Sequence, residues 1–429
     1  MTNMQAIFAQ ALDRGRWNRF ADSVAVALAA SLPWSTSATG IFATLLVVAL
    51  IPTLSVADLR RVLLTAAGGL PVLLWALGVI GMLWADVPMS ERLDGLGSFH
   101  KLLFIPLLMV QFERSDHGRW VLVGFLASCT VLLVLSWTLA LLPDLAWRDP
   151  RWPGVPVKNY ATQADIFTFC MFAFGAWAVV EWQQRRRRFA LMFAVLALAL
   201  FVNVLYAAPS RTALVVMPVL LLPFCWRWIG AKGTIGLVTA LAALGAVAWS
   251  TSSLLQERVN TFTTELATYR TANARTPIGE RIEFWTKSVG FIRTAPVIGH
   301  GTGSIRDQFR RAATGDSGAS SVVAANPHNQ TFAVAIQLGL VGTGVLVAMW
   351  LCHLLLFRAQ GFAAWLGLIE VLQNMVGSLF NSHLFDFTQG WMYVVGVGVA
   401  GSTVLWNQRR AAAAICSDVP EPDIATKLR

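Results

Sequence analysis

The chain has 429 residues, of which 56% are hydrophobic and 13% charged, and its mean hydropathy is +0.60. This composition excludes an ordinary soluble globular protein and indicates a membrane protein. The net charge of +10 arises from basic residues that gather at the ends of apolar runs, so it indicates membrane orientation rather than nucleic-acid binding.

Apolar runs of transmembrane length recur along the whole chain. About twelve are expected to be spans, at residues 20–34, 41–56, 62–84, 100–112, 120–142, 161–182, 189–207, 212–230, 234–251, 329–356, 361–380 and 390–406. The first is weak because Pro33 ends it early, and the fourth is short enough to be tilted or partly re-entrant. The predicted fold class is an all-α polytopic membrane protein.

The orientation follows from the short connections between these runs. With the N-terminus in the cytoplasm, the basic residues on the cytoplasmic side are Arg14, Arg16, Arg19, Arg60, Arg61, Arg114, Arg119, Arg185, Arg186, Arg187, Arg188, Arg227, Lys232, Arg358, Arg409 and Arg410. The short connections on the other side hold far fewer. The positive-inside rule therefore predicts that both termini are cytoplasmic. No cleaved signal peptide is expected, since a polar, basic segment without a small-residue cleavage site precedes the first run.

One long polar segment divides the chain. We expect nine spans in residues 1–251, a large extracytoplasmic loop at 252–328, three spans at 329–406 and a short cytoplasmic tail at 407–429. Apolar periodicity in the loop predicts one helix from Leu255 to Tyr269 and another from Ile282 to Ile292. The glycine-rich stretch 296–304 is interpreted as a chain reversal, because it lacks the strand and lysine of a phosphate-binding loop.

His328 is the strongest candidate for chemistry, since it lies where this loop meets the next apolar run. Asn326 and Asn329 flank it and are expected to orient its ring. Gly339 and Gly342 follow, three residues apart, and would allow another helix or a lipid to come close. Three further histidines are expected on this side, where simple solvation is the ordinary role: His100, His300 and His383.

Three cations on the outer side are candidates for binding an anion. Arg211 lies in the shortest outer connection with no acidic residue nearby in the sequence, so a membrane anchor and an anion site both stay open. Arg281 opens a predicted helix, where pairing with Glu280 or Glu283 is the alternative to a substrate role. Lys101 is a weaker third candidate.

Polar residues near the expected helix ends complete the set. Asn159 and Gln163 lie one turn apart and are suited to hydrogen-bond a sugar or pyrophosphate, although helix capping explains Asn159 equally well. Glu370 and Asn374 form an intramembrane polar pair, for which helix packing and a transport step both stay open. Asp386 is a candidate partner for an arginine or for His328. No Asp-x-Asp motif occurs, so a metal-bound sugar diphosphate is not indicated.

These residues resemble the O-antigen ligase family, which is related to the O-antigen polymerases and the bacterial O-oligosaccharyltransferases. The family pattern is His, then Asn, Ser or Gln, nine residues, Gly, two residues, and Gly, Thr or Tyr. His328, Asn329, Gly339 and Gly342 match it fully. The Ser210–Thr212 turn, the helix with Arg281 and Trp285, and the turn 296–301 resemble other family landmarks in the same order.

The resemblance implies a GT-C-like glycosyltransferase in the bacterial inner membrane, with its active site facing the periplasm. The implied donor is O-antigen on undecaprenyl diphosphate, the implied acceptor is a sugar hydroxyl of lipid A–core, and no metal or other cofactor is required. His328 would be the general base in an inverting displacement, and arginines would stabilise the leaving diphosphate. The candidate substrate-binding residues are Arg211, Arg281, Asn329, Lys101, Asn159 and Gln163.

Three alternatives stay open. A polymerase would use the same donor with a second lipid-linked glycan as acceptor. A protein O-oligosaccharyltransferase would glycosylate Ser or Thr, but those relatives often carry an extra C-terminal periplasmic domain, whereas the tail here is short. A lipid-glycan flippase or transporter would be expected to have polar residues through the bilayer midplane and two symmetric halves, whereas polarity here concentrates on one face.

Overall fold

The computed structural model describes residues 14–417, which contain helices and no strand. The α-helices are α2 (Arg14–Ser31), α3 (Thr36–Leu50), α4 (Val56–Leu63), α5 (Ala66–Gly81), α6 (Met89–Gly97), α7 (Phe104–Arg114), α8 (Gly118–Leu141), α9 (Tyr160–Gln183), α10 (Arg187–Tyr206), α11 (Arg211–Phe224), α12 (Gly230–Thr251), α13 (Ser253–Ala272), α14 (Pro277–Thr294), α15 (Ile305–Arg311), α16 (Gln330–Leu356), α17 (Phe362–Gly377) and α18 (Phe387–Ser417). Each expected apolar run overlaps one of these helices.

By length and composition, five described segments are able to cross a membrane, or up to seven if each of two bent pairs is one span. One pair is α4 with α5, bent by 89°, and the other is α6 with the segment His100–Arg114, bent by 45°. The structure is therefore consistent with a polytopic membrane protein, and the bend agrees with an irregular fourth span. Twelve spans stay a prediction, because helices such as α3 and α17 are short for a bilayer.

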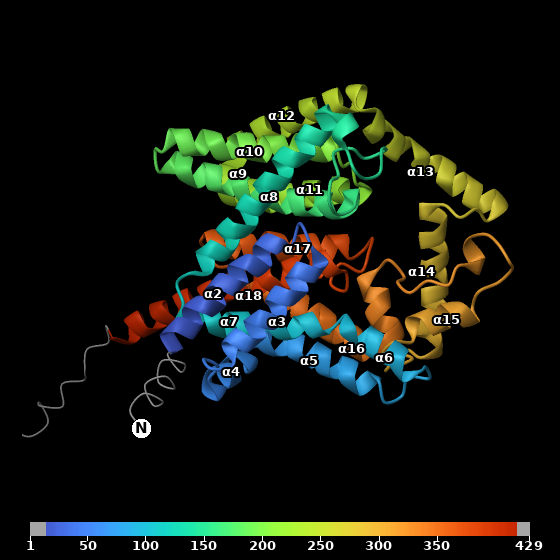
Figure 1. The fold of residues 1–429 in the computed structure, drawn as a ribbon, viewed down its shortest axis with the longest axis horizontal. Coiled ribbons are helices and arrows are strands. Elements are labelled where there is room, and N and C mark those ends of the chain that lie inside the picture. The colour runs from blue at the N-terminus through green and yellow to red at the C-terminus, as the bar shows by residue number, and fades with distance from the viewer. Residues whose placement is uncertain (1–13, 418–429) are drawn as a thin grey trace, which may run out of the picture.

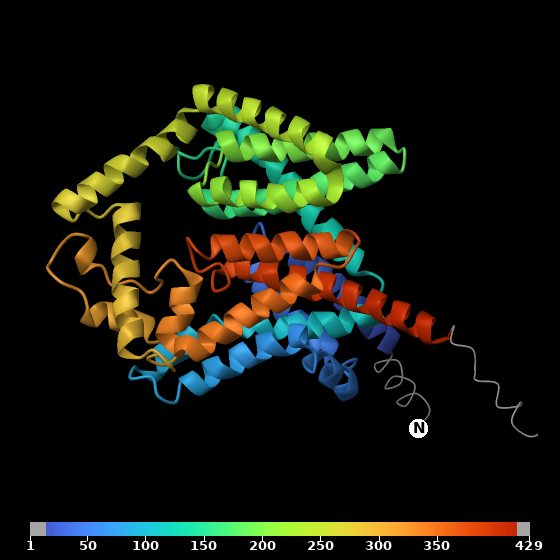
Figure 2. The same ribbon diagram turned by 180° about the vertical axis from the view of Figure 1, so that it is seen from behind.

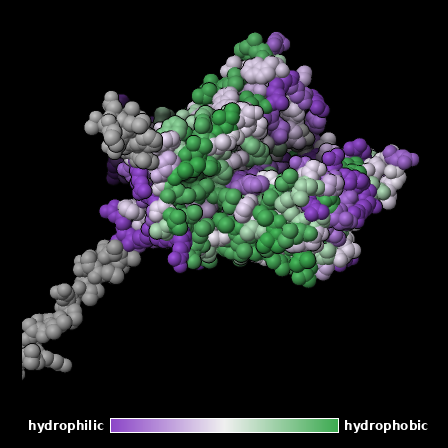
Figure 3. All heavy atoms as spheres, turned by 60° about the horizontal axis from the view of Figure 1, so that its bottom comes forward, coloured by the Kyte–Doolittle hydropathy of each residue, from purple (hydrophilic) through white to green (hydrophobic). Residues whose placement is uncertain are grey.

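Most helices run along the long axis of the molecule (Figures 1 and 2). Helices α9 to α12 form one group beside a second group made of α2 to α7 and α16 to α18, and α8 runs between the two. Hydrophobic side chains form a broad surface between hydrophilic ends (Figure 3). Helices α13 to α15 lie at one end, whereas α2 begins and α18 ends at the other. This arrangement gives the bundle one end that carries the polar loop.

The two helices predicted in the loop are confirmed as α13 and α14, and α15 is a third that the sequence did not indicate. Helix α16 is kinked at Gly339, which has a φ of +61°. The turn 296–301 packs into this kink, where the Gly301 amide donates to the Gln337 carbonyl over 2.9 Å. A Cβ atom on Gly339 would lie 2.3 Å from the Val297 carbonyl oxygen. The close approach expected at this glycine is therefore confirmed, but the neighbour is the loop turn rather than a helix or a lipid.

Candidate active site

The backbone at His328 has a strained conformation. Its φ is +52°, in the left-handed region that residues other than glycine seldom adopt. The Asn326 Oδ1 atom accepts a hydrogen bond from the His328 amide at 2.8 Å and another from the Ser382 hydroxyl at 2.6 Å. The polar connection between α17 and α18 thus holds the histidine in place just before α16 begins.

The ring of His328 is oriented by a chain of hydrogen bonds. Asn381 Nδ2 donates to Asp386 Oδ2 at 2.6 Å, which turns Asn381 Oδ1 toward His328 Nδ1 at 2.7 Å. Since Oδ1 is an acceptor only, Nδ1 must carry the proton and Nε2 the lone pair. The Phe284 ring stacks on the imidazole at 6.1 Å between centroids. Within the described residues Nε2 has no hydrogen-bond partner, so this nitrogen is available to act as a base.

The environment keeps His328 neutral. Burial lowers its pKa from 6.5, and the positive charge of Arg281 lowers it further, while the hydrogen bond to Asn381 and the charge of Glu280 oppose this shift. At neutral pH the ring is therefore an unprotonated acceptor, which is the form that general-base catalysis requires.

Arg281 lies in the first turns of α14 and has no hydrogen bond or ion pair with any described side chain or backbone group. Both acids considered as its partners are engaged elsewhere: Glu280 with Arg275 at 3.0 Å and Glu283 with Lys287 at 3.2 Å. Burial is the main cause of its lowered pKa, and the nearby Arg211 adds to the shift. Such a half-buried cation is suited to an anionic substrate group.

Arg211 begins α11 and binds Glu265 of α13 with two prongs, at 3.1 and 2.8 Å. The Thr261 hydroxyl accepts a third bond from it at 2.8 Å. The sequence shows no acid close to Arg211, but the fold brings one from 54 residues away. Arg211 and Glu265 are both near enough to Arg281 to influence its pKa, so the two arginines and this carboxylate lie in one region of the site.

Two of the candidate binding residues brace the loops around this site. Asn329 caps α16 by accepting from the Phe332 amide at 3.1 Å, and its Nδ2 donates to the Leu379 carbonyl at 3.2 Å. Lys101 is buried and its ammonium donates to the carbonyls of Phe385 and Asp386, at 3.0 and 2.7 Å. Both side chains hold the segment that carries the Asn381–Asp386 pair.

The remaining two candidates lie on α9. Asn159 caps this helix by accepting from the Thr162 amide at 2.8 Å. Gln163 is buried and donates to the Ser136 hydroxyl and the Gly154 carbonyl, each at 3.0 Å. No hydrogen bond joins either residue to the arginines or to His328. Their neighbour Tyr160, which the sequence did not indicate as a site residue, does influence Arg281 electrostatically.

Two of the other histidines considered for the outer face, His300 and His383, have structural roles, whereas His100 is exposed as expected. His300 Nε2 lies 2.9 Å from the Phe291 carbonyl and 3.1 Å from the Thr294 hydroxyl. His383 is 3% exposed, and burial lowers its pKa to about 4. The prediction that His383 is a solvated loop residue is therefore wrong.

A polar cavity of about 270 Å³ adjoins the histidine loop. Asn326, Ser382 and Asp386 line it on the side of His328, and Glu91 and Asp94 line it from α6. Carboxylates and amides are the groups that accept hydrogen bonds from sugar hydroxyls. This cavity can hold a saccharide, whereas the arginines suit a phosphate group.

The partners of His328 were only partly predictable. Asp386 was considered as its partner, and the structure links the two through Asn381 instead of directly. Asn326 was expected to orient the ring but binds the backbone amide. The signal available in the sequence was the polar interruption 381–386 between two apolar runs, where Asn381 and Asp386 stand five residues apart.

A first prediction tests the orientation of the imidazole. Asn381→Leu removes the acceptor for Nδ1–H, so kcat should fall about tenfold, the worth of one hydrogen bond. Asn381→Asp keeps an acceptor and adds a negative charge, which raises the pKa of His328 and moves the acidic limb of the pH–rate profile to higher pH. Steady-state transfer assays across pH measure both effects. Unchanged kcat and pH profile in both variants would show that Asn381 does not position the ring.

Comparison with known proteins finds a family that resembles the segment carrying most of this site. Residues 196–347, about a third of the chain, match the family model described as O-Antigen ligase, and this region contains Arg211, Arg281 and His328. No curated protein matched the chain. The match supports a glycosyltransferase-like activity of the O-antigen ligase or polymerase type, acting on lipid-linked polysaccharide. The segment 196–347, which carries these three residues, is therefore similar to the O-antigen ligase family.

Proposed function

We propose that this protein is an O-antigen ligase, which transfers O-antigen polysaccharide from undecaprenyl diphosphate to a sugar hydroxyl of lipid A–core. One observation carries the proposal: His328, which is able to act as a base, and Arg281, which has no ion-pair partner among the described residues, lie at the same end of a bundle of membrane helices. A transferase of this kind needs a base for a neutral hydroxyl and a cation for a departing diphosphate, and the site contains both.

In the proposed reaction, His328 Nε2 takes the proton of the acceptor hydroxyl as that oxygen attacks the anomeric carbon of the donor. The new C–O bond forms while the bond from the anomeric carbon to the diphosphate breaks. The leaving undecaprenyl diphosphate keeps the bonding electrons, and Arg281 and Arg211 stabilise its charge. One displacement inverts the anomeric configuration, and the proton ends on the imidazole, which then returns it to water.

The proposed placement of the two substrates follows from the charges around His328. The donor diphosphate lies against Arg281 and Arg211, and the acceptor saccharide enters the 270 Å³ cavity beside Asn326 and Asp386. Three acidic residues, Glu91, Asp94 and Asp386, line that cavity beside one basic residue, Arg306, so its acidic side repels phosphate and accepts hydrogen bonds from sugar hydroxyls. His328 is adjacent in sequence to Pro327, which lines the cavity, and it is close enough to Arg281 for that charge to lower its pKa, so a base near both substrates is compatible with this placement.

We further propose that the site faces the periplasm from the inner membrane, with both termini in the cytoplasm. The described chain begins and ends opposite the loop helices α13 to α15. The basic residues Arg114, Arg119 and Arg410 lie at that opposite end, around one cavity mouth. This charge distribution agrees with the positive-inside rule and supports the orientation.

Transfer by the purified enzyme tests the function and its metal requirement together. Lipid-linked O-antigen mixed with lipid A–core should give polymer-bearing lipopolysaccharide, and excess EDTA should leave the rate unchanged, because arginines supply the counter-charge. Gel mobility of the product and release of undecaprenyl diphosphate are the readouts. A strict Mg²⁺ or Mn²⁺ requirement, restored by adding metal back, would overturn the metal-independent mechanism.

The acceptor separates a ligase from a polymerase. A ligase leaves long O-chains on the lipid carrier when its gene is deleted, and the core then carries no O-antigen. A polymerase deletion instead gives a core that bears a single repeat. Elongation of a second lipid-linked glycan by the purified enzyme, with no transfer to lipid A–core, would assign the protein as a polymerase.

A further inference from the structure

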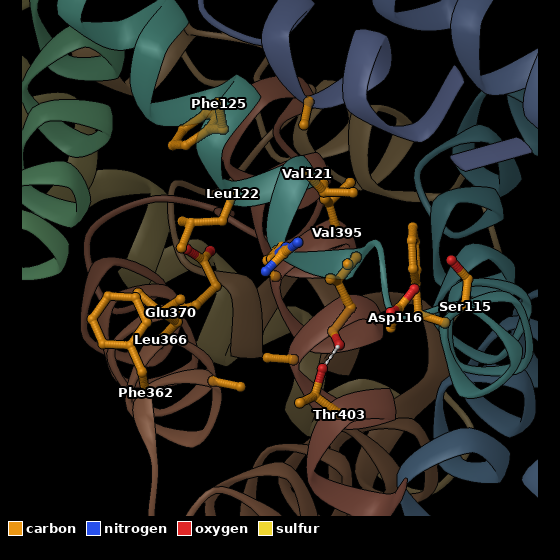
Figure 4. A pocket seen from close by; sticks show the side chains of 18 of the residues that line it. Ser115, Asp116, Val121, Leu122, Phe125, Phe362, Leu366, Glu370, Val395 and Thr403 are labelled. Atoms are coloured by element: carbon orange, nitrogen blue, oxygen red, sulfur yellow. Dashed lines mark hydrogen bonds between the residues drawn. The ribbon is translucent and has the colours of Figure 1, made fainter. Parts of the chain in front are cut away.

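A second cavity, of about 620 Å³, lies between α8, α17 and α18, toward the end of the bundle where α2 begins and α18 ends. Apolar side chains form most of its wall, and Figure 4 shows Leu122, Phe125, Leu366 and Val395 around it. No residue of the proposed transfer site lines this cavity. Helix α17 connects the two places, because its C-terminal end leads to the connection that contains Asn381. Its wall is suited to a hydrocarbon chain.

Two arginines line the mouth of this cavity without a carboxylate partner among the described residues. Arg119 and Arg410 each lie over a nearby tryptophan ring, at 5.5 and 5.8 Å from its centroid. Arg409, on the same helix turn, is by contrast paired with Glu113 at 2.8 Å. The carboxyl of Asp116 also lies at the mouth, and it is exposed like both arginines, so one exposed negative charge stands against two exposed positive charges. The mouth therefore attracts an anion.

Glu370 supplies an independent sign of a ligand. Its side chain is 3% exposed, it lines the cavity, and Figure 4 shows its carboxyl pointing inward. It has no hydrogen bond or ion pair with a described residue. An ionised carboxylate left in such surroundings is costly, so the neutral acid, which can donate one hydrogen bond, is the form that the site favours. An acceptor group on a bound molecule would satisfy it.

We propose that this cavity binds an anionic phospholipid from the adjoining membrane leaflet. The phosphate lies between Arg119 and Arg410, an ester carbonyl accepts the proton of Glu370, and an acyl chain fills the apolar part. Leu122, beside the interior of the cavity, is about one helical turn, roughly 5 Å, from Arg119 along α8. Gly118, next to Arg119, packs beside Val399 of α18, and Glu370 packs beside Gly396, so the carboxyl lies further into the bundle than Arg119, as ester carbonyls lie below the phosphate of a phospholipid.

The donor lipid fits this cavity less well. A polyprenyl diphosphate has an anionic head and an apolar tail, but no ester carbonyl at the depth of Glu370. The cavity also lies at the opposite end of α17 from the histidine site, so a donor bound here would hold its reacting carbon far from His328. The unpartnered carboxyl thus distinguishes a phospholipid from the substrate.

Binding of phosphatidylglycerol and phosphatidylcholine to the full-length protein tests the proposal. Native mass spectrometry in detergent should show preferential retention of phosphatidylglycerol by the wild type. Reversal of both charges in Arg119→Glu/Arg410→Glu should weaken this binding about tenfold or more, since each arginine contributes a charge-assisted hydrogen bond. Arg188→Glu, an exposed basic residue at the same end of the bundle, is the matched control and should bind like the wild type.

Glu370 gives a second test that does not depend on the arginine variant folding. Glu370→Gln keeps a hydrogen-bond donor and should retain the lipid, whereas Glu370→Leu should lose about tenfold in affinity. Gel filtration and residual transfer activity check that each variant is folded. Equal binding of both lipids by the wild type, unchanged binding by the arginine or leucine variants, or a retained polyprenyl lipid in place of a phospholipid would each overturn the proposal.

Discussion

Replacing Arg281 with alanine is expected to lower the rate of glycan transfer by about a hundred- to a thousandfold, the usual effect of removing one preorganised donor from a developing negative charge. Arg281 is half-buried and has no partner among the described residues, so its charge is available to the substrate. The loss should appear in kcat more than in KM, because the charge on the bridging oxygen grows as the bond to the diphosphate breaks. Single-turnover transfer measures it.

Two variants make this result specific. Arg281→Lys keeps the charge but lacks the two-pronged donor, so it should restore little activity. Arg275→Ala removes a neighbouring, more exposed arginine that pairs with Glu280, and it should leave transfer nearly unchanged. Full activity in the lysine variant would reduce the requirement to charge alone, and full activity in Arg281→Ala would remove this residue from the mechanism.

Arg211 differs from Arg281 because its guanidinium already donates two hydrogen bonds to Glu265. Glu265→Gln separates two roles for it. If Arg211 binds the diphosphate, loss of the competing carboxylate should leave transfer intact or lower the KM for the donor. If the ion pair only holds α13 against α11, Glu265→Gln should be as damaging as Arg211→Ala, and the proposed contact with substrate would be wrong.

Helix positions were largely predictable because membrane helices are set by local apolar composition. Each expected apolar run overlaps a helix, and α13 and α14 follow the predicted periodicity of the loop. What composition does not encode is the path of the backbone. The 89° bend between α4 and α5, and the kink at Gly339, depend on neighbours that are distant in sequence. The turn 296–301 pairs with carbonyls that this kink leaves free.

In the site, too, local features were predictable from the sequence and contacts between distant residues were not. His328 was identifiable because it stands alone at a boundary between a polar loop and an apolar run, a property of the sequence itself. Its partner Asn381 is 53 residues away, and Glu265 is 54 residues from Arg211. Such contacts arise only when helices pack. Asn159 and Gln163 show the converse, since their spacing suggested a shared binding face, but each makes its own contacts within the bundle.

The loss expected from His328→Ala is about a hundred- to ten-thousandfold in kcat, the range that general-base assistance provides. Binding of radiolabelled lipid-linked donor should persist, since Arg281 and Arg211 remain. His300→Ala is the matched control, because within residues 14–417 its ring hydrogen-bonds to the Phe291 carbonyl and the Thr294 hydroxyl of the same loop, and this variant should transfer nearly normally.

The pH–rate profile tests the same role without a substitution. His328 acts as a base only when neutral, so transfer should fall as the pH drops through its pKa. Burial and the charge of Arg281 lower that pKa below 6.5, and the acidic limb should therefore lie below this value. In His328→Ala the limb should disappear from the residual rate. Suppose instead that His328→Ala keeps near-normal transfer and His300→Ala or His383→Ala does not. The base would then be another histidine, and His328, held by Asn326 and Asn381, would serve only to join the polar loop to α16.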